Sequence, residues 1–197
     1  MTWDDDQAWE IGWWGDCINT FGEETKQITY ASRMGVPLVD DGSGKWPIYD
    51  ARGASVADIG GGPVSMLLKA AHLSESQPSV VVDPGKYPDW TADRYAAAGV
   101  DLDRSAGEDF TPEVDYDEAW IYNCLQHTQD PERIVANARA ASRTIRIFEW
   151  INLPPSLGHP QTLTEPDLNR WLGGSGKCEY MNENGCIGLA YFGVFDS

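Results

Sequence analysis

The stretch SVADIGGGPVSM, residues 55–66, decides the fold of this chain. A short apolar run ends in an acid and is followed at once by three glycines and a proline. Such a run is typical of a buried strand, and the glycines permit a tight turn out of it. We therefore expect a strand over 55–59 and, beyond the turn, a helix over 63–73.

The rest of the chain repeats this alternation of apolar runs and helical patterns. Further strands are expected over 79–83, near 100–102, and over 116–123 and 144–151, with helices over 91–99, 131–143 and 164–172. The segments KCEYM and CIGLAYFGVF flank a polar ENG turn and predict a terminal hairpin. The pattern indicates an α/β fold with a mostly parallel sheet covered by helices. Such a sheet binds ligands at the carboxyl ends of its strands, which places the site at the glycine turn.

The composition limits the class of protein. With 197 residues, 42% of them hydrophobic, the chain can form one good core. Its formal charge of −17, without a basic stripe in the sequence, argues against nucleic-acid partners. Neither a signal peptide nor a membrane span is apparent, so we expect a cytoplasmic protein with no membrane partner. The four cysteines show no CxxC pair, which predicts free thiols and no metal site.

Three residues around the glycine turn disfavour a ligand that carries phosphate. The carboxylate of Asp58 would oppose a pyrophosphate, and Pro63 removes a backbone donor that a phosphate at a helix start would use. Ser65 replaces the last glycine of the dinucleotide-binding fingerprint. S-adenosylmethionine fits better, because it has an adenosine, a positive centre and an amino group that Asp58 can help to place. Asp83 ends the second strand and can accept bonds from both ribose hydroxyls, although an acid there can also simply begin a turn.

Five motifs in sequence order resemble those of the class I S-adenosylmethionine-dependent methyltransferases that act on small molecules. They are VADIGGG (56–62), VVVDP (80–84), SAGEDF (105–110), YDEAWIYNCLQHTQDP (116–131) and GHPQTLTEPDLNRWLGG (158–174). The chain departs from the family pattern at Gly62-Pro63, which tightens the first loop, and at Gln126, where an acid is commoner.

The resemblance implies a particular fold and a particular cofactor. The fold is a doubly wound, Rossmann-like, seven-stranded sheet of order 3-2-1-4-5-7-6 with strand 7 antiparallel, and an N-terminal helical lid lies over the cofactor. The cofactor is S-adenosylmethionine, with S-adenosylhomocysteine as product and no metal. Its expected binding residues are Asp58, Gly60, Gly61, Gly62, Ser65, Asp83, Pro84, Gly107, Glu108, Asn123 and Cys124.

The motifs leave the N-terminal part of the chain unexplained. We interpret residues 1–50 as a Trp-rich helical segment, or lid, ahead of a methyltransferase domain over 51–197, with the Gly- and Pro-rich stretch 37–53 as the connector. Thr20 and Glu23 have the spacing of a capping box, and Gly35 can end a helix, which predicts a helix over about 21–34.

Three tryptophans, Trp9, Trp13 and Trp14, precede this helix. Either they anchor the helix to the sheet, or they belong to a lid whose indoles line a substrate pocket. In the second interpretation the substrate-binding candidates are Trp13, Trp14, Asn19 and Tyr30, and one of Asn19, Lys26 and Tyr30 reaches the cofactor carboxylate. Indole faces suit an apolar, sugar or cationic substrate.

Methyl transfer needs in-line alignment, exclusion of water and a base for an oxygen or ammonium nucleophile. His127, Glu149 and His159 follow strands at the carboxyl edge and are the candidate catalytic residues. His159 has the clearest case, because it lies in a loop between Gly158 and Pro160. Alternatively, His127 only bridges its turn to the next helix, and Glu149 pairs with an arginine, Arg146 or Arg170.

The sequence thus predicts a methyltransferase that acts on a small molecule, with an oxygen nucleophile (a sugar or another metabolite) favoured. The alternatives are an S-adenosylmethionine-using enzyme of another reaction type, a non-catalytic cofactor-binding module, and a nicotinamide oxidoreductase, which Pro63 and Ser65 disfavour. A homo-oligomer is compatible with the sequence, which identifies neither the acceptor nor the acceptor atom.

Overall fold

The fold is built on one seven-stranded sheet in a computed structural model that describes residues 2–40, 42, 44 and 46–197. The strand order is β5-β4-β2-β6-β7-β9-β8, and β9 runs antiparallel to both of its neighbours. This order confirms the predicted 3-2-1-4-5-7-6 topology and the terminal hairpin. The strands are β2 (Val56–Ile59), β4 (Ser79–Val82), β5 (Val100–Asp103), β6 (Tyr116–Tyr122), β7 (Ser142–Trp150), β8 (Lys177–Glu183) and β9 (Cys186–Asp196).

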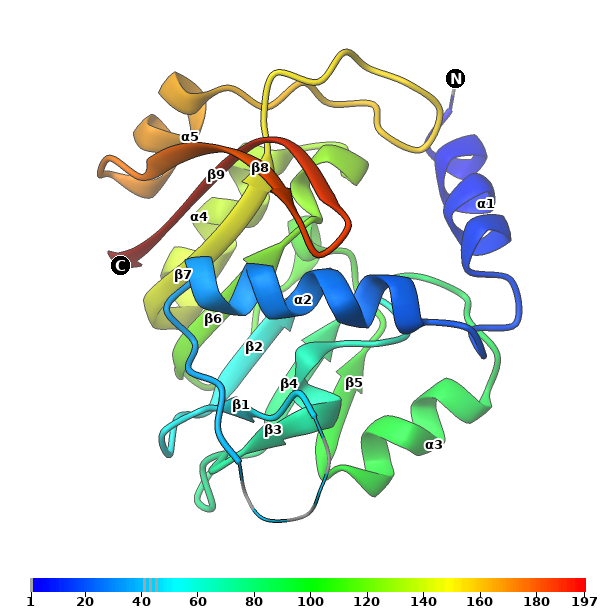
Figure 1. The fold of residues 1–197 in the computed structure, drawn as a ribbon, viewed down its shortest axis with the longest axis vertical. Helices are drawn as coiled ribbons and strands as arrows, with labels where there is room; N and C mark the ends of the chain where they lie inside the picture. Colours follow the sequence, from blue (N-terminus) through cyan, green and yellow to red (C-terminus); the bar gives the residue numbers. More distant parts are fainter. Residues whose placement is uncertain (1, 41, 43, 45) are drawn as a thin grey trace.

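Helices cover both faces of the sheet, because strand residues alternate between two apolar cores. Ala57 and Ile121 belong to the core that includes residues of α4, whereas Val56 and Trp120 belong to the core that includes residues of α2. In Figure 1, α2 crosses in front of the sheet, α4 lies behind it, and α1 stands apart at one side. The helices are α1 (Trp3–Trp14), α2 (Phe21–Arg33), α3 (Trp90–Ala97), α4 (Pro131–Ala141) and α5 (Glu165–Leu172).

The predicted helix over 63–73 is wrong. The chain forms one 3-10 turn, Met66–Lys69, and then β3 (Ala70–Ala71), which pairs with β1 (Tyr49–Asp50) in a small separate sheet. The cause is tertiary: the backbone N–H of Ser65 donates to the Tyr95 hydroxyl, and that of Met66 donates to the Tyr122 hydroxyl. These bonds to buried side chains hold the segment in a tight turn, and α2 covers this face of the sheet instead.

The N-terminal segment contains two helices of different character. The helix predicted over 21–34 is confirmed as α2, and Gly35, at φ +69°, follows its end. The capping box predicted at its start is wrong, because Thr20 makes no side-chain cap bond. A capping box forms instead at the start of α1, between Thr2 and Asp5. The division at residue 50 stays a prediction, although the buried residues of α2 share a core with the sheet.

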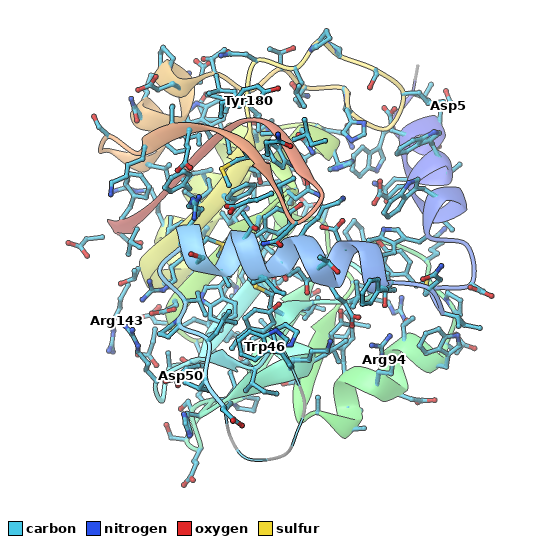
Figure 2. The ribbon with its side chains drawn as sticks, in the orientation of Figure 1. Asp5, Trp46, Asp50, Arg94, Arg143 and Tyr180 are labelled. Carbon is cyan, nitrogen blue, oxygen red and sulfur yellow. The ribbon has the colours of Figure 1, made fainter. Side chains whose placement is uncertain are left out.

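The surface of the described residues carries scattered charges. Asp5 lies on the outer side of α1, and Arg94 and Arg143 lie on opposite sides of the molecule (Figure 2). All four cysteines are free thiols, as expected. Within the described residues, none of the helices combines the length and apolar character that crossing a membrane requires.

Candidate active site

A cavity of about 340 Å³ lies where the glycine turn, the ends of β4, β6 and β7, and helices α1 and α2 meet. Most of the predicted site residues contribute to its wall. Those that line it are Gly60, Gly61, Gly62, Asp83, Pro84, Gly107, Glu108, Asn123, Cys124, His127, His159, Trp13, Trp14 and Lys26.

The glycine turn brings the ends of β2, β4 and β6 together. Gly60 adopts φ +76° and its N–H donates to the carbonyl of Val82 at 2.8 Å. A Cβ at Gly60 would overlap the Sγ of Cys124 and lie 2.7 Å from its Cβ, so only glycine allows this close approach. A Cβ added at Gly62, which has φ +62°, would lie 3.7 Å from its nearest contact, an atom of Trp14, apart from its neighbours in the chain. The turn therefore presents bare backbone to the cavity.

Asp83 fixes the other side of this turn. Its two carboxylate oxygens accept the N–H groups of Gly62 at 2.9 Å and Gly85 at 2.8 Å. Burial raises the pKa of Asp83 to about 6, although these two bonds favour the charged form. The Tyr87 hydroxyl also bonds to this carboxylate, so two neighbouring hydroxyls of a ligand would share its remaining lone pairs with Tyr87.

Asp58 and Ser65 lie beneath the glycine turn and outside the cavity lining. The carboxylate of Asp58 accepts hydrogen bonds from the hydroxyls of Ser65 and of Tyr122, the latter at 2.6 Å. Burial raises the pKa of Asp58 to about 7. The strand alternation explains this placement, because Asp58 sits between Ala57 and Ile59, whose side chains pack into the opposite core. In this structure the two residues support the turn.

Glu149, one of the candidate bases, is also outside the cavity lining. Its Oε1 accepts the backbone N–H groups of Cys124 and Leu125, both at 3.0 Å, so the side chain holds the turn after β6. Burial raises its pKa to about 8. The alternative that Glu149 pairs with an arginine is wrong: Arg146 pairs with Glu118 at 2.7 Å, and Arg170 pairs with Glu132 and Asp167.

His127 and His159 form a pair at the cavity wall, with ring centroids 4.3 Å apart. The Nδ1 of His127 lies 2.7 Å from the carbonyl oxygen of Gly158, so this nitrogen carries the proton and Nε2 is left as the acceptor. Burial lowers the pKa of both rings, and for His159 the neighbouring His127 lowers it further. Burial therefore favours the neutral form of both imidazoles, which is the form that can accept a proton, although it also makes each ring a weaker base.

Helix α1 forms the outer wall with four tryptophans, which are Trp3, Trp9, Trp13 and Trp14. Trp14 Nε1 donates to Glu10 Oε1 at 2.8 Å, and Glu10 Oε2 lies 3.4 Å from His127 Nδ1. Trp9 packs over Gly158 in the loop after β7, which differs from the expected anchoring of the 21–34 helix to the sheet. Trp13, 56% exposed, and Trp14 line the cavity, and their role in binding a substrate stays a prediction. Glu10 was missed in the sequence, although residues 3, 7, 10 and 14 have the spacing of one helix face.

Helix α2 adds a polar edge to the cavity. Lys26 Nζ lies 2.8 Å from Glu23 Oε2, and Gln27 donates to the carbonyl of Val64 at 2.6 Å.

Two of the substrate candidates, Asn19 and Tyr30, do not line the cavity. Asn19 is exposed, and Tyr30 is fully buried with its ring 4.5 Å from that of Phe148. Sequence reasoning missed Glu23, Gln27, Tyr87 and Trp150, which the cavity includes.

The far end of the cavity is set by the loops after β5 and β6. Gly107 packs against Ile59 and Ile134, and Glu108 accepts the N–H groups of Gln129 and Asp130 at 2.9 and 3.1 Å. Asn123 turns the chain at φ +51°. Among the described residues, no group of three His, Cys, Asp or Glu side chains could hold a metal ion.

No protein-family model matches the chain, and a comparison with curated proteins found no match. Solved structures do match it. One is a 1,6-didemethyltoxoflavin-N1-methyltransferase from Burkholderia thailandensis with bound 1,6-didemethyltoxoflavin and S-adenosylhomocysteine. The two sequences are 15% identical, and the match covers 98% of this chain and 84% of that enzyme, with a TM-score of 0.59. Another is the magnesium protoporphyrin IX methyltransferase of Synechocystis PCC 6803 with bound S-adenosylmethionine, 13% identical over 98% of each chain, with a TM-score of 0.60.

A third structure, an O-methyltransferase family protein from Burkholderia thailandensis, is 11% identical, with 87% of this chain and 55% of that chain covered and a TM-score of 0.60. At these identities the likeness establishes the fold. The chain has the Rossmann-like fold of the class I S-adenosylmethionine-dependent methyltransferases, as its motifs predicted.

Proposed function

We propose that this protein transfers the methyl group of S-adenosylmethionine to a small-molecule acceptor. One observation carries the proposal: the bare glycine turn and the carboxylate of Asp83 face one cavity, and a 3-10 turn replaces the helix after them. A dinucleotide phosphate would need the N–H groups and the dipole of that helix. An adenosine without phosphates needs only a diol acceptor and room beside the backbone.

The residues that would hold the cofactor are assigned from the motif resemblance together with their places in the cavity wall. Asp83 accepts the ribose hydroxyls, and Gly107 and Glu108 border the adenine. The turn at Gly60 to Gly62 and the loop at Asn123 and Cys124 enclose the methionine end. Lys26, on α2, is the cation placed to meet the cofactor carboxylate. The bound cofactor supplies a methyl group already activated by its sulfonium.

The chain then has to place the acceptor and accept its proton. Helix α1 and its indoles exclude water from the cavity, which favours in-line displacement. The pair His127 and His159 provides the base for an oxygen nucleophile. We favour His159 because its Nδ1 lies 3.5 Å from the Ser156 hydroxyl, a weak contact, whereas His127 Nδ1 lies 2.7 Å from the Gly158 carbonyl oxygen. Glu149 supports the turn that carries His127. The 1,6-didemethyltoxoflavin-N1-methyltransferase, whose structure holds 1,6-didemethyltoxoflavin and S-adenosylhomocysteine, supports a small-molecule acceptor for this fold.

Isothermal titration with S-adenosylmethionine, S-adenosylhomocysteine and NAD tests the proposal. We expect micromolar binding of the first two ligands and none of NAD. Tighter binding of NAD would contradict the cofactor assignment. Binding of S-adenosylmethionine that is followed by release of its aminobutyrate chain, traced with label there and on the methyl group, would instead indicate another reaction of the same cofactor.

A further inference from the structure

The cavity wall carries more negative charge than its own residues neutralise. Four carboxylates line it, from Glu10, Glu23, Asp83 and Glu108. Among the described residues that line the cavity, Lys26 is the only lysine or arginine, and it is already 2.8 Å from Glu23. Both lining histidines have lowered pKa values because they are buried, so they add little positive charge at neutral pH.

Glu10 is the cavity carboxylate that lies among the indoles of α1, and no lysine or arginine pairs with it among the described residues. Its oxygens meet two neutral donors, the indole N–H of Trp14 at 2.8 Å and the His127 ring at 3.4 Å. Burial raises its pKa, which shows that its surroundings disfavour the bare anion. A cation in the cavity would remove this penalty and gain the attraction of a partly desolvated charge.

The indoles around Glu10 complete the environment of a cation. Trp14 and Trp13 stand nearly perpendicular, with ring centroids 4.8 Å apart, and Trp9 lies one residue from Glu10 on the same helix. Trp150 lines the cavity from the end of β7. Tryptophan is the side chain whose face attracts organic cations most strongly, and it also binds flat apolar rings.

From these observations we infer that the acceptor carries an ammonium group, protonated or quaternary, on a flat or apolar scaffold, in addition to the hydroxyl oxygen that takes the methyl group, and that Glu10 and the α1 indoles select this ammonium group. This inference rests on the proposed function, since it concerns the acceptor part of the same cavity. It narrows the substrate class, because anionic metabolites are repelled and neutral sugars gain nothing from Glu10.

Three probes that differ mainly in charge test the inference: 2-phenylethylammonium, 2-phenylethanol and phenylacetate. Each is titrated calorimetrically into the free protein and into protein saturated with S-adenosylhomocysteine, which is itself titrated first. We expect the ammonium to bind the loaded protein about tenfold more tightly than the alcohol, and the carboxylate to bind least. Glu10→Gln, which can still accept the Trp14 bond, should abolish the preference, whereas Asp4→Asn, an exposed acid of the same helix, should keep it.

The outcomes separate this inference from the proposed function. If S-adenosylhomocysteine binds but the ammonium shows no preference, or no probe binds at millimolar concentration, the inference is wrong and the cofactor assignment stands. A preference that exists in the free protein and vanishes on loading would assign the carboxylates to the cofactor and overturn the inference. If S-adenosylhomocysteine fails to bind while the Glu10-dependent preference persists, the proposed function fails and the cation site remains.

Discussion

The buried carboxylate of Asp6, on α1, accepts a hydrogen bond from the backbone N–H of Gly158, in the loop after β7, at 2.8 Å. The ring of Trp9, one turn further along α1, covers the same glycine so closely that a Cβ there would overlap it. These contacts join the first helix of the chain to the loop that carries His159. The outer wall of the cavity is therefore attached to this loop through Gly158.

Removal of this bond should loosen α1 without unfolding the sheet. Asp6→Ala deletes a bond to a charged acceptor, for which a loss of about 1.5–3 kcal/mol is typical. We expect the amides of α1 to exchange their hydrogens about ten- to a hundredfold faster, with protection in β6 and β7 unchanged. Hydrogen exchange read by mass spectrometry measures this, and Asp4→Ala in the same turn is the control. Equal exchange in the two variants would show that Asp6 does not hold the helix.

The close approach of Gly60 to Cys124 predicts unequal costs for two alanine substitutions in the glycine turn. Both Gly60 and Gly62 have positive φ, so each variant suffers the backbone cost. Only Gly60→Ala adds an overlap with Cys124, whereas Gly62→Ala meets nothing nearer than 3.7 Å. We expect the free energy of unfolding of Gly60→Ala to be about 1–3 kcal/mol lower than that of Gly62→Ala in denaturant titrations. Cys124→Ala should restore part of this difference; if the two glycine variants are equally stable, the turn can relax around the added methyl group.

Asp83 should contribute directly to cofactor affinity. Asp83→Ala removes the acceptor proposed for both ribose hydroxyls, and bonds to a charged acceptor contribute about 1.5–3 kcal/mol. Isothermal titration with S-adenosylhomocysteine should show this loss, while Asp101→Ala, an exposed acid on the next strand, should bind as the unaltered protein does. An unchanged dissociation constant in folded Asp83→Ala would remove Asp83 from the site.

Glu149 should make the protein less stable as the pH rises. Its pKa is about 8 in the folded protein and near 4.5 when exposed, so the folded state retains a proton that the unfolded state has lost. The stability is fully present below pH 4.5 and is lost as the pH rises towards the folded value, on the order of a few kcal/mol in all. Glu149→Gln keeps the bonds to Cys124 and Leu125 and should flatten the slope of denaturation midpoint against pH. The exposed control Glu113→Gln should not; an unchanged slope in Glu149→Gln would assign it to other groups.

The sheet could be predicted from the sequence because its signals are local. A few neighbouring residues are enough to recognise each element, as for the apolar run at residues 79–83, the glycine turn and the terminal hairpin. The helix predicted over 63–73 shows where local patterns fail. The conformation of this segment depends on the hydroxyls of Tyr95 and Tyr122, which come from distant segments and bind the backbone of Ser65 and Met66.

The candidate site likewise contains residues that local motifs predict and residues whose positions depend on long-range packing. The residues at the ends of strands, such as Gly60 and Asp83, were predicted from motifs and line the cavity. Side chains whose direction depends on packing were harder to predict, which is why Tyr30 is in the core. Glu10 was missed because helical spacing places it on one face with residues 3, 7 and 14 but does not say what that face contacts, which depends on the long-range docking of α1.

The last prediction assigns different roles to the two histidines. An acceptor hydroxyl must lose its proton as the methyl group arrives, and His159, buried enough to have a lowered pKa, can accept it. A general base typically contributes about 10²–10⁴-fold, so His159→Ala should lower turnover by that order and leave cofactor affinity within about threefold. His127 bonds to the Gly158 carbonyl and lies in the turn after β6, so His127→Ala should first weaken cofactor binding or stability.

Calorimetry with S-adenosylhomocysteine compares the cofactor affinities of the two variants directly, and their turnover is compared with an identified acceptor. If His159→Ala abolishes cofactor binding while His127→Ala leaves it intact, the roles are reversed; if His159→Ala turns over undiminished, positioning alone drives the reaction.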